Sequence, residues 1–491
     1  MTTSDLEHLI SKRAAARYSS HFSQNTAPAH IKAHPEPLSL GGGMPHYGFF
    51  PVESIAVHLT DAPFSDKKLE TLKLDSKSKN PVIIPKVTDR PDDIIDLKNG
   101  LQYSYIQGLK PLLLFLKEFV QKVYPPAYND WEVVLNNGAG NGLNKVCDLF
   151  LDPGDVVLVE EFTFTPFLQS VENCGGIPIP IKLDFQGKGL DYNHLKYELE
   201  NWEILHPGLP LPKFLYTIPT GQNPTGLTQP LELRKKIYKL AEKFDFGILE
   251  DDPYGYLTLP PYKDVKSGKF DVDAPVTVDN FVKELAPSYL TIDTSKRVVR
   301  VETFSKVFAP GLRLGYIIAN KSFIKAINNY SNISTRSPSG PSQFLVNNVI
   351  QHLGGIDGWL EWIIKVRREY IIRRNVMLDA LYASDAYKKN LITVIDPDAG
   401  MFITVVINYD KSKYTPAEYK QLTSKNLFYK TIENGVAVVH GPNMAFDNLA
   451  DEHCNFVRLT IASPPDHATI TEATNRFTKS VEELFEEIEK T

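Results

Sequence analysis

Residues 297–318 read RVVRVETFSKVFAPGLRLGYII and hold two apolar runs that meet at a turn. The runs 297–305 and 312–318 are rich in Val, Leu and Ile, which favours β-strands. Lys306 and a Pro-Gly pair stand between them. A lysine at a strand end in a shielded pocket has a lowered pKa, and its neutral amine forms Schiff bases with carbonyl groups. Taken alone, Lys306 is better explained as a lysine whose stem packs at the edge of the core.

Short apolar runs alternate with helical patterns on both sides of this stretch. Apolar spacing from Leu109 to Phe119 predicts a helix, and two more are predicted at 140–151 and 230–244. Further strands are predicted at 131–135, 155–160, 177–183, 213–219 and 246–251. Continuous Val, Ile and Leu runs that alternate with helices are typical of a mostly parallel sheet covered on both faces. The sequence therefore predicts an α/β fold.

The chain of 491 residues is long enough for two or more lobes. Residues 1–100 show few regular patterns, and we expect the polar stretch 65–100 to be a long surface excursion. After about residue 345, a long helix (356–383) precedes the runs MFITVVI, VAVVHG and FVRLTIA and a final helix (467–488), which is typical of an α+β lobe. We predict an N-terminal arm at 1–100, a large domain at 101–335 and a small domain at 336–491.

Charge and cysteine content exclude several classes of function. The chain has 53 Lys and Arg against 59 Asp and Glu, a net charge of −6, which gives no electrostatic reason to expect nucleic acid or an anionic membrane as partner. No apolar run approaches the length of a membrane-spanning helix. Cys147, Cys174 and Cys454 lack metal-ligand spacing and indicate buried thiols in a reducing compartment. We predict a cytoplasmic protein without a bound metal.

One predicted strand end favours an anion. Ligands bind at the carboxyl ends of strands in a parallel sheet. Strand 131–135 runs into NNGAGNGLNK, where Gly138, Gly140 and Gly142 permit close backbone approach and a helix begins. The free N–H groups at a helix start favour an anion such as phosphate. An ordinary Gly-rich turn explains the same residues.

Two more strand ends carry unusual polar residues. Strand 213–219 leads into TGQNPTG, in which Asn223 precedes a proline; a plain turn capped by asparagine explains this as well. Strand 246–251 ends in EDDPYGY, with three consecutive acids. An acid at a buried strand end needs a partner. For Asp252, the last of the three, a solvated loop start is the better interpretation.

These stretches have a joint meaning. They supply a phosphate anchor, an acid, an amide donor, hydroxyl groups, a guanidinium and a Schiff-base lysine. These are the groups needed to hold pyridoxal phosphate, with the acid paired to the protonated pyridine nitrogen so that the ring withdraws electrons.

The stretches TIPTGQNPTG, EDDPYGYL and ETFSKVFAPGLRLGY follow the order and approximate spacing of known motifs. In these motifs the sequence resembles the fold type I pyridoxal-phosphate aminotransferases, in particular the fungal aromatic amino acid aminotransferases. That branch is shared with α-aminoadipate and kynurenine aminotransferases. The resemblance extends from LSLGGGMP to the C-terminal helix. It implies a large domain with a helix-covered sheet, a smaller α+β domain, and ping-pong transfer of an amino group between Phe, Tyr or Trp and 2-oxo acids such as 2-oxoglutarate or phenylpyruvate.

The resemblance assigns roles around the cofactor ring. Lys306 matches the Schiff-base lysine, which also acts as general base and acid. Asp251 matches the partner of the pyridine nitrogen. Asn223 and Tyr254 match the donors to the cofactor's phenolic oxygen. Phe164, in EEFTFTP, matches the aromatic residue that stacks on the ring, although core packing explains it as well.

A second set of residues matches the phosphate-binding cup of the family. These residues are Ala139, Gly140, Thr303, Ser305 and Arg313. The family often has Ser and Gln at the first two positions, so only the backbone amides of this chain serve there.

The remaining matches concern the substrate and the second subunit. Arg458, in FVRLTIAS, matches the arginine that grips the substrate α-carboxylate, with Asn223 beside it; a surface strand arginine is the alternative. Gly43 lies in the segment that closes over the substrate in the family. Tyr103, in LQYSY, matches a tyrosine that reaches the phosphate of the neighbouring subunit. The resemblance therefore implies a homodimer with shared active sites.

Other functions stay open at this point. The cofactor residues alone do not separate transamination from β-elimination or decarboxylation. A regulator that binds the cofactor without catalysis would need a helix-turn-helix module ahead of LSLGGGMP, where neither that pattern nor a basic surplus occurs. Side-chain specificity is also open, including 2-aminoadipate and kynurenine as donors. Tyr47, Phe49, Phe50 and Phe402 supply an aromatic wall or only pack structurally.

Overall fold

The structure is a computed structural model. It describes residues 6–18, 28, 30–32, 34–36, 43–60, 80–186, 188–410, 412–446 and 453–490. Its centre is a seven-stranded sheet in the order β3-β11-β10-β9-β8-β4-β5. These strands are β3 (Trp131–Asn136), β4 (Val156–Glu160), β5 (Ile177–Ile181), β8 (Phe214–Thr217), β9 (Gly247–Asp251), β10 (Val298–Thr303) and β11 (Gly315–Asn320). Only β11 runs antiparallel to its neighbours in this sheet, so the predicted α/β fold with a mostly parallel sheet is confirmed.

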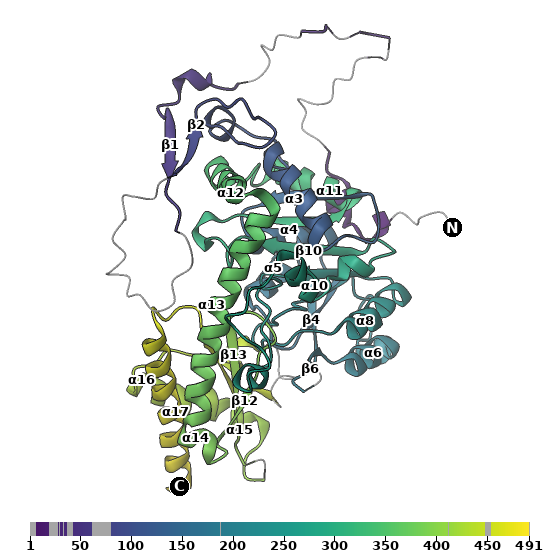
Figure 1. The fold of residues 1–491 in the computed structure, drawn as a ribbon. Helices are drawn as coiled ribbons and strands as arrows, with labels where there is room; N and C mark the ends of the chain where they lie inside the picture. The colour runs from purple at the N-terminus through teal and green to yellow at the C-terminus, as the bar shows by residue number, and fades with distance from the viewer. Residues whose placement is uncertain are drawn as a thin grey trace.

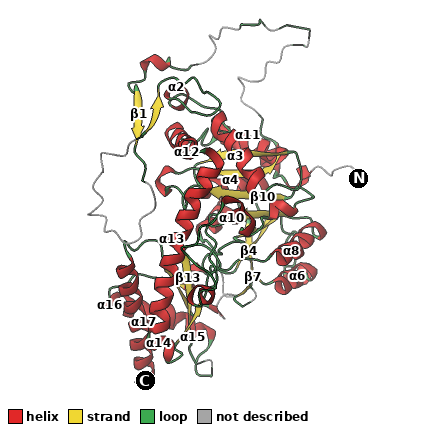
Figure 2. Ribbon diagram, in the orientation of Figure 1, coloured by secondary structure: helices red, strands yellow, loops and turns green. Residues whose placement is uncertain are grey.

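Helices cover both faces of this sheet (Figure 2). One face carries α4 (Ala139–Phe150), α5 (Pro166–Asn173) and α11 (Lys321–Ile333). The other face carries α3 (Lys110–Val123) and α8 (Leu231–Lys243), with α6 (Tyr192–Glu200) packed on α8. Neighbouring residues of β10 show the division, because the Val301 side chain lies close to Gly142 of α4 and Arg300 faces Tyr124 at the end of α3.

The turn after β10 differs from the prediction in one respect. The second apolar run was expected to be a strand from residue 312, but β11 begins at Gly315. Pro310–Leu312 form a short 3₁₀ turn, and Arg313 adopts a left-handed conformation with φ of +47°. Gly315 then fits where a Cβ would lie 2.5 Å from the carbonyl oxygen of Glu302. The chain thus reverses tightly and keeps Arg313 near the end of β10.

A second sheet is built from the C-terminal part of the chain, in the order β12-β13-β15-β14. Its strands are β12 (Ile392–Ile395), β13 (Phe402–Ile407), β14 (Val439–His440) and β15 (Phe456–Thr460). The associated helices are α14 (Asp385–Lys388), α15 (Pro416–Gln421), α16 (Phe428–Glu433) and α17 (His467–Lys490). The long helix α13 (Gly355–Ala383) runs from the large sheet's region to this lobe (Figure 1). The domain limits at 100 and 335 stay predictions.

The N-terminal hundred residues are more regular than expected. The strands β1 (Ser54–Val57) and β2 (Val82–Pro85) form an antiparallel pair, and α2 (Leu97–Gly100) is capped by the side chain of Asp96. The hairpin packs beside α12 (Gly340–Leu353), at the end of the molecule opposite the C-terminus (Figure 1). Part of the predicted surface excursion, 65–79, lies outside the described residues. The other elements of this part are η1 (Leu6–Leu9), α1 (Lys12–Ala15) and η3 (Tyr47–Phe49).

Two predicted strands were too long. The run 177–183 divides into β5 and β6 (Leu183–Asp184), and β6 pairs instead with β7 (Gly189–Leu190). The run VAVVHG contributes only the two residues of β14. Short helices complete the chain at α7 (Trp202–Leu205), α9 (Tyr262–Lys266), α10 (Val278–Glu284), η5 (Tyr289–Ile292), η7 (Leu422–Leu427) and η8 (Gly441–Met444).

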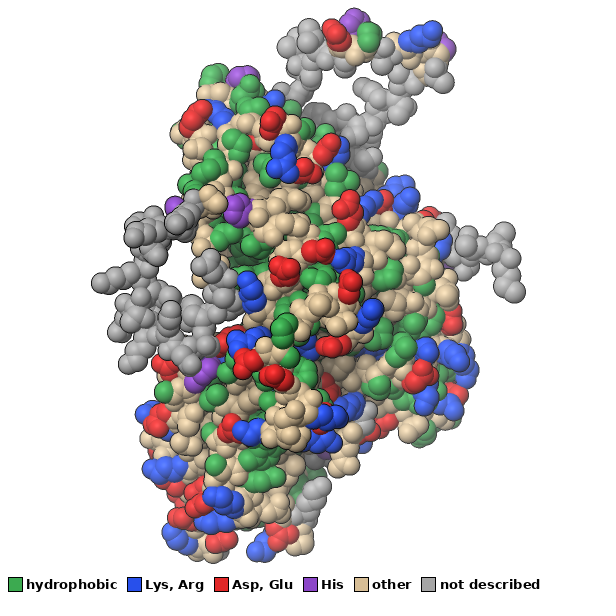
Figure 3. Space-filling view, in the orientation of Figure 1, with side chains coloured by type: hydrophobic (Ala, Val, Ile, Leu, Met, Phe, Trp, Pro, Cys, Tyr) green, Lys and Arg blue, Asp and Glu red, His purple; other side chains and the backbone are tan. Residues whose placement is uncertain are grey.

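The surface carries charges of both signs. On the face shown in Figure 3, Lys and Arg side chains are interspersed with Asp and Glu, and hydrophobic side chains are scattered among them. Among the described helices, none is long and apolar enough to cross a membrane.

Candidate active site

A pocket of about 190 Å³ lies at the carboxyl ends of five strands of the large sheet. Residues that follow β3, β4, β8 and β10 and the last residue of β9 all contribute to it, as expected for an edge where parallel strands end together. Its lining is Ala139, Gly140, Leu143, Phe164, Ile218, Asn223, Asp251, Pro253, Tyr254, Thr303, Ser305, Lys306, Pro310 and Arg313. The structure thus brings together ten residues predicted from the sequence.

Lys306 is half-buried and lines this pocket. Burial lowers the pKa of its amine, and the positive charges of Arg313 and Arg458 lower it further. A larger fraction of the amine is therefore neutral near pH 7 than for a free lysine, which is the form that acts as nucleophile or base. A lysine that merely snorkels would instead extend its charge to solvent.

Asp251 ends β9 with its side chain nearly inaccessible to solvent. The Tyr216 hydroxyl donates to Asp251 Oδ2 at 2.8 Å, whereas the buried Oδ1 has no hydrogen-bond partner within the described part of the chain. Burial raises the pKa of the Asp251 carboxyl to about 7; Asp252 raises it further, while Tyr216 and Arg300 lower it. The unpartnered Oδ1 is an acceptor that is available to a cationic or N–H group of a ligand.

This raised pKa predicts a pH-dependent stability in the ligand-free protein. Between pH of about 4 and 7, folded Asp251 keeps a proton that the unfolded chain has released, so the free energy of unfolding falls as the pH rises. The full difference between about 7 and the ordinary 3.8 corresponds to about 4 kcal/mol. Denaturant unfolding across this range should show a shallower decline for Asp251→Asn than for wild type. Equal slopes in the two proteins would contradict the raised pKa.

A cradle of backbone and polar groups lies at the start of α4. Gly138 caps this helix with φ of +88°, and a Cβ built there would approach Arg313 Nη2 to 2.6 Å. None of the side chains that the structure describes caps the helix. The hydroxyls of Thr303 and Ser305 lie 2.8 Å apart on the same pocket. Backbone N–H groups at a helix start, hydroxyls and a guanidinium are groups that can bind a phosphate.

A second group of residues joins the pocket to the small lobe. Arg458 Nη1, from β15, donates to Asn223 Oδ1 at 2.7 Å, and its Cζ lies 3.9 Å from the centre of the Phe402 ring. The Tyr254 and Phe402 rings meet edge to face at 6.0 Å. Arg458 is half-buried, and burial lowers the pKa of its guanidinium. It therefore lies among aromatic side chains beside the pocket, not on an open strand surface.

Of the remaining predicted residues, one lines this pocket and the others lie outside its lining. Phe164 does line it and is 37% exposed, which is not the burial expected of core packing. Tyr103, at 78% exposure, and Gly43 lie outside the pocket within the single chain. Of the four residues considered for an aromatic wall, none is in the pocket lining: Phe402 contacts Arg458 and Tyr254, whereas Tyr47, Phe49 and Phe50 lie in or beside η3.

The structure corrects one expectation and adds one residue. Asp252 was expected to begin a solvated loop, but it is only 3% exposed and pairs with Arg300. Tyr216, which contacts Asp251, was not identified from the sequence. A phenol within the apolar strand of KFLYTIP was the available signal, because a buried hydroxyl needs a partner.

Within the described residues, no group of three or more His, Cys, Asp or Glu side chains is placed to bind a metal ion.

Comparison with known proteins agrees with this geometry. Residues 72–477 match the profile of the family described as aminotransferase class I and II. The chain is 37% identical to aromatic amino acid aminotransferase 2 of Saccharomyces cerevisiae over 480 residues, which cover 91% of each protein. It also matches the crystal structure of the aromatic aminotransferase Aro9 from C. albicans, with a TM-score of 0.89, 47% identity and 99% coverage of both chains.

A more distant structural match is the kynurenine aminotransferase of Pyrococcus horikoshii, solved in complex with PMP. Its TM-score is 0.64 at 26% identity, over 78% of this chain and 83% of that one. The matches to the family and to the fungal proteins cover the large sheet, the pocket and the small lobe alike. The chain belongs to the class I and II aminotransferases, a family of fold type I that uses pyridoxal phosphate.

Proposed function

We propose that this protein transfers amino groups between aromatic amino acids and 2-oxo acids, using pyridoxal phosphate bound in the pocket. One observation carries the proposal: a half-buried lysine with a lowered pKa shares a pocket with a buried carboxyl whose second oxygen lacks a partner in the described chain. Such a pair fits a cofactor that has a carbonyl group at one position and a ring nitrogen at another.

Different residues of the pocket fit different chemical groups of this cofactor. Lys306 would hold its carbonyl carbon, and Asp251 Oδ1 would accept from its ring nitrogen. Asn223 and Tyr254 would donate to its phenolic oxygen. Asn223 Oδ1 is already engaged by Arg458, which leaves the amide nitrogen as donor. When bound, pyridoxal phosphate supplies a ring that withdraws electrons from the substrate's α carbon.

The phosphate and the ring face have their own contacts. The backbone amides of Ala139 and Gly140, with Thr303, Ser305 and Arg313, would hold the phosphate, in the cradle at the start of α4. Phe164 would cover the ring, since it is partly exposed on the pocket wall.

The chain's own groups account for the chemistry on the substrate. Arg458 would grip the α-carboxylate, and its stacking on Phe402 and hydrogen bond to Asn223 fix the guanidinium in place. The amine of Lys306 would take the proton from the α carbon as general base. Burial and the positive charges of the two nearby arginines lower the pKa of this amine, which favours the neutral form that acts as a base.

The choice of aromatic substrates has two supports. The fungal relatives at 37% and 47% identity are named as aromatic aminotransferases. The Phe402 ring stacks on Arg458 and meets the Tyr254 ring edge to face, and aromatic pairs attract beyond simple burial. A 2-aminoadipate or kynurenine donor is the alternative, favoured by the match to the archaeal kynurenine aminotransferase.

A panel of amino donors tests the substrate class. Phe, Tyr, Trp, 2-aminoadipate and kynurenine should be assayed with 2-oxoglutarate and with phenylpyruvate as acceptor. We expect the three aromatic amino acids to have the highest kcat/KM and initial rates to show ping-pong kinetics. A preference for 2-aminoadipate or kynurenine would favour the alternative, and product formation without amino transfer would favour elimination or decarboxylation.

We further infer a homodimer in which Tyr103 completes the partner's pocket. Tyr103, Tyr105 and Phe49 are each at least 78% exposed in the single chain, and exposed aromatic side chains of this kind mark interaction surfaces. Gly43, in the same N-terminal segment as Phe49, would cover the substrate. Cys147, Cys174 and Cys454 are all buried, and buried thiols are typical of proteins in a reducing compartment, which supports a cytoplasmic location.

Mixing two inactive variants tests the shared site. A mixed dimer of Lys306→Ala and Tyr103→Asp would have one site with both defects and one intact site, so activity should recover to at most about half of wild type. The control pair, Lys306→Ala with Asp251→Asn, places both defects in pockets of their own chains and should recover no activity. Equal behaviour of the two mixtures after proven subunit exchange would show that Tyr103 does not act across subunits.

A further inference from the structure

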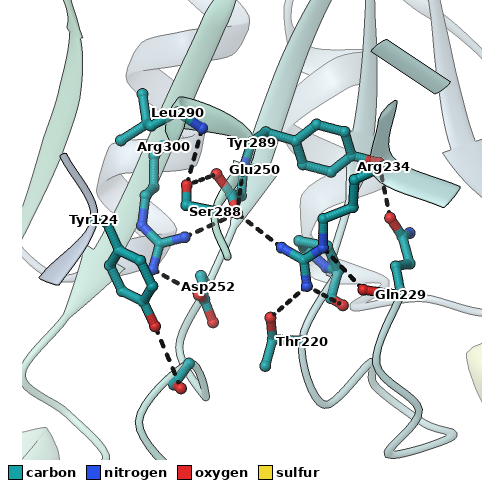
Figure 4. A network of polar contacts seen from close by, with 12 residues as sticks. Tyr124, Thr220, Gln229, Arg234, Glu250, Asp252, Ser288, Tyr289, Leu290 and Arg300 are labelled. Atoms are coloured by element: carbon teal, nitrogen blue, oxygen red, sulfur yellow. Dashed lines mark hydrogen bonds and ion pairs between the residues drawn. The ribbon is translucent and has the colours of Figure 1, made fainter. Parts of the chain in front are cut away.

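A buried cluster of charges lies on the face of the large sheet opposite to Asp251, and Figure 4 shows its residues Arg300, Glu250 and Asp252. At its centre, Arg300 donates to three carboxylates: to Glu250 Oε1 at 2.8 Å, to Asp252 Oδ2 at 2.6 Å and to Glu302 Oε1 at 2.6 Å. The Arg300 side chain is fully buried, with its Cζ 4.2 Å from the centre of the Tyr124 ring. The mechanism on the pocket side makes no direct use of this cluster.

Strand alternation places the cluster next to the pocket. Arg300 lies opposite Glu250 in the β9–β10 pairing, and Val301 lies opposite Asp251. Successive side chains of a strand point to opposite faces, so Asp251 enters the pocket while Glu250 and Asp252 face Arg300. One peptide unit therefore separates the pocket carboxyl from a carboxylate that Arg300 holds.

The same carboxylate holds the turn after β9. Asp252 Oδ1 accepts from the backbone N–H of Tyr254 at 3.3 Å, while its Oδ2 is bound by Arg300. The ring of Tyr124 lies beside Arg300 in Figure 4, and its hydroxyl donates to the carbonyl oxygen of Gly255 at 3.4 Å. Arg300 thus connects through Asp252 to the turn that carries two pocket residues.

We propose that Arg300 is a positioning residue for the pocket: it holds Asp252, fixes the turn that carries Asp251 and Tyr254, and offsets the negative charge of Asp252 beside Asp251. This inference rests on the proposed function, because it explains how Asp251 keeps the charge that a protonated ring nitrogen requires.

The charges around Asp251 make it possible to test whether Arg300 offsets the negative charge of Asp252. Tyr216 from β8 donates to it, Glu160 at the end of β4 faces it, and Asp252, Tyr254 and Arg300 complete its surroundings. Burial raises the pKa of Asp251, Asp252 adds to this rise, and Tyr216 and Arg300 oppose it. Removal of the Arg300 charge should therefore favour the protonated form of Asp251, and removal of the Asp252 charge should favour the ionised form.

The cluster contains more acidic than basic side chains. Glu250, Asp252 and Glu302 face Arg300 and Arg234, and Figure 4 shows the two arginines on either side of Glu250. Without Arg300, the cationic partner left to the three carboxylates among the described residues would be Arg234, 3.5 Å from Glu250. Substitution of Arg300 is therefore expected to affect folding as well as the pocket, and the test has to separate the two effects.

Arg297 provides the matched control. It is a buried arginine directly before β10 that donates to the carbonyl oxygens of Ala241 and Phe246 at 3.0 Å each. Arg297→Met removes the same kind of side chain from the same segment without touching the turn after β9.

The experiment compares holoenzymes of wild type, Arg300→Met, Arg300→Lys, Asp252→Asn and Arg297→Met. Two quantities are measured: kcat/KM as a function of pH, and hydrogen–deuterium exchange of the peptide containing Tyr254. We expect Arg300→Met to move the acid limb of the pH profile up by about one pH unit and Asp252→Asn to move it down by a similar amount. Arg300→Lys should leave the limb near its wild-type position. Exchange at Tyr254 should accelerate about tenfold or more in Arg300→Met and Asp252→Asn, and stay unchanged in Arg297→Met.

Acid limbs that stay in place in both Arg300→Met and Asp252→Asn, with exchange matching Arg297→Met, would overturn the inference and leave Arg300 a purely structural role. If Arg300→Met does not fold, Asp252→Asn decides: a downward shift supports the inference and an unmoved limb overturns it. Failure of wild type to take up pyridoxal phosphate would instead refute the proposed function, and exchange at Tyr254 in the cofactor-free proteins would still test whether Arg300 holds the turn.

Discussion

Lys306→Ala should reduce transamination by about 10⁴-fold, the upper end of what general acid–base catalysis contributes. The variant loses both the amine that would bind the cofactor's carbonyl carbon and the base that would take the substrate's α proton. Its fold should persist, because the side chain is half-buried at the pocket wall and no ion pair holds it among the described residues. Steady-state rates with an aromatic donor and 2-oxoglutarate check the loss, and thermal unfolding checks the fold.

Lys145 offers a matched control for this prediction. It is buried within α4, and burial lowers the pKa of its amine to about 8. It therefore shares the electrostatic signature of Lys306 but lies outside the pocket lining. Lys145→Met should keep activity within about tenfold of wild type once folded protein is compared. Comparable losses in the two variants would show that a lowered pKa, and not a place in the pocket, explains the effect at Lys306.

Asp251→Asn should retain the fold and some cofactor but lose about 10³-fold in transamination, comparable to the removal of a preorganised electrostatic contact. A neutral amide does not hold the ring nitrogen protonated, so the ring withdraws electrons less strongly. Loss of a hydrogen bond to a charged group should also weaken cofactor binding by about 1.5–3 kcal/mol. Cofactor titration followed by absorbance, together with kcat, separates the two effects.

The neighbouring carboxyl supplies the comparison for Asp251. Asp252→Asn removes a charge one residue further along, on the opposite face of the sheet, where Arg300 binds it. Its loss of activity should be smaller, about tenfold, and should come with the shifted pH profile described above. Near-normal turnover of Asp251→Asn would contradict the assignment and make Asp252 the first acid to examine.

Much of the fold was predictable because it depends on local patterns. The apolar run of β4 is buried on both faces, so its continuous hydrophobicity identifies it, and β9 and β10 are buried strands that contain apolar residues before their acidic ends. Strand ends were less predictable. β11 starts late because Arg313 adopts a left-handed conformation, and the pairing of β1 with β2 depends on contacts between short segments within a polar region.

The pocket residues were likewise predictable where they depend on local sequence, and less so where they depend on how strands pair. Lys306, Asp251 and Asn223 were singled out because they stand at strand ends, which meet in a parallel sheet, but their individual roles came from the resemblance to the aminotransferases. The pairing of Asp252 with Arg300 was missed because it depends on the β9–β10 register, which a single sequence does not fix. The stacking of Arg458 on Phe402 depends likewise on the packing of two strands in a different lobe.

Borohydride reduction of the holoenzyme tests the central claim most directly. Reduction should fix the cofactor to the protein, and digestion followed by mass spectrometry should place it on the peptide that contains Lys306, with the peptide of Lys145 unmodified. Both lysines have lowered pKa values, but only Lys306 lines the pocket with Asp251. Attachment of the cofactor to any other lysine, with Lys306 unmodified, would contradict the account.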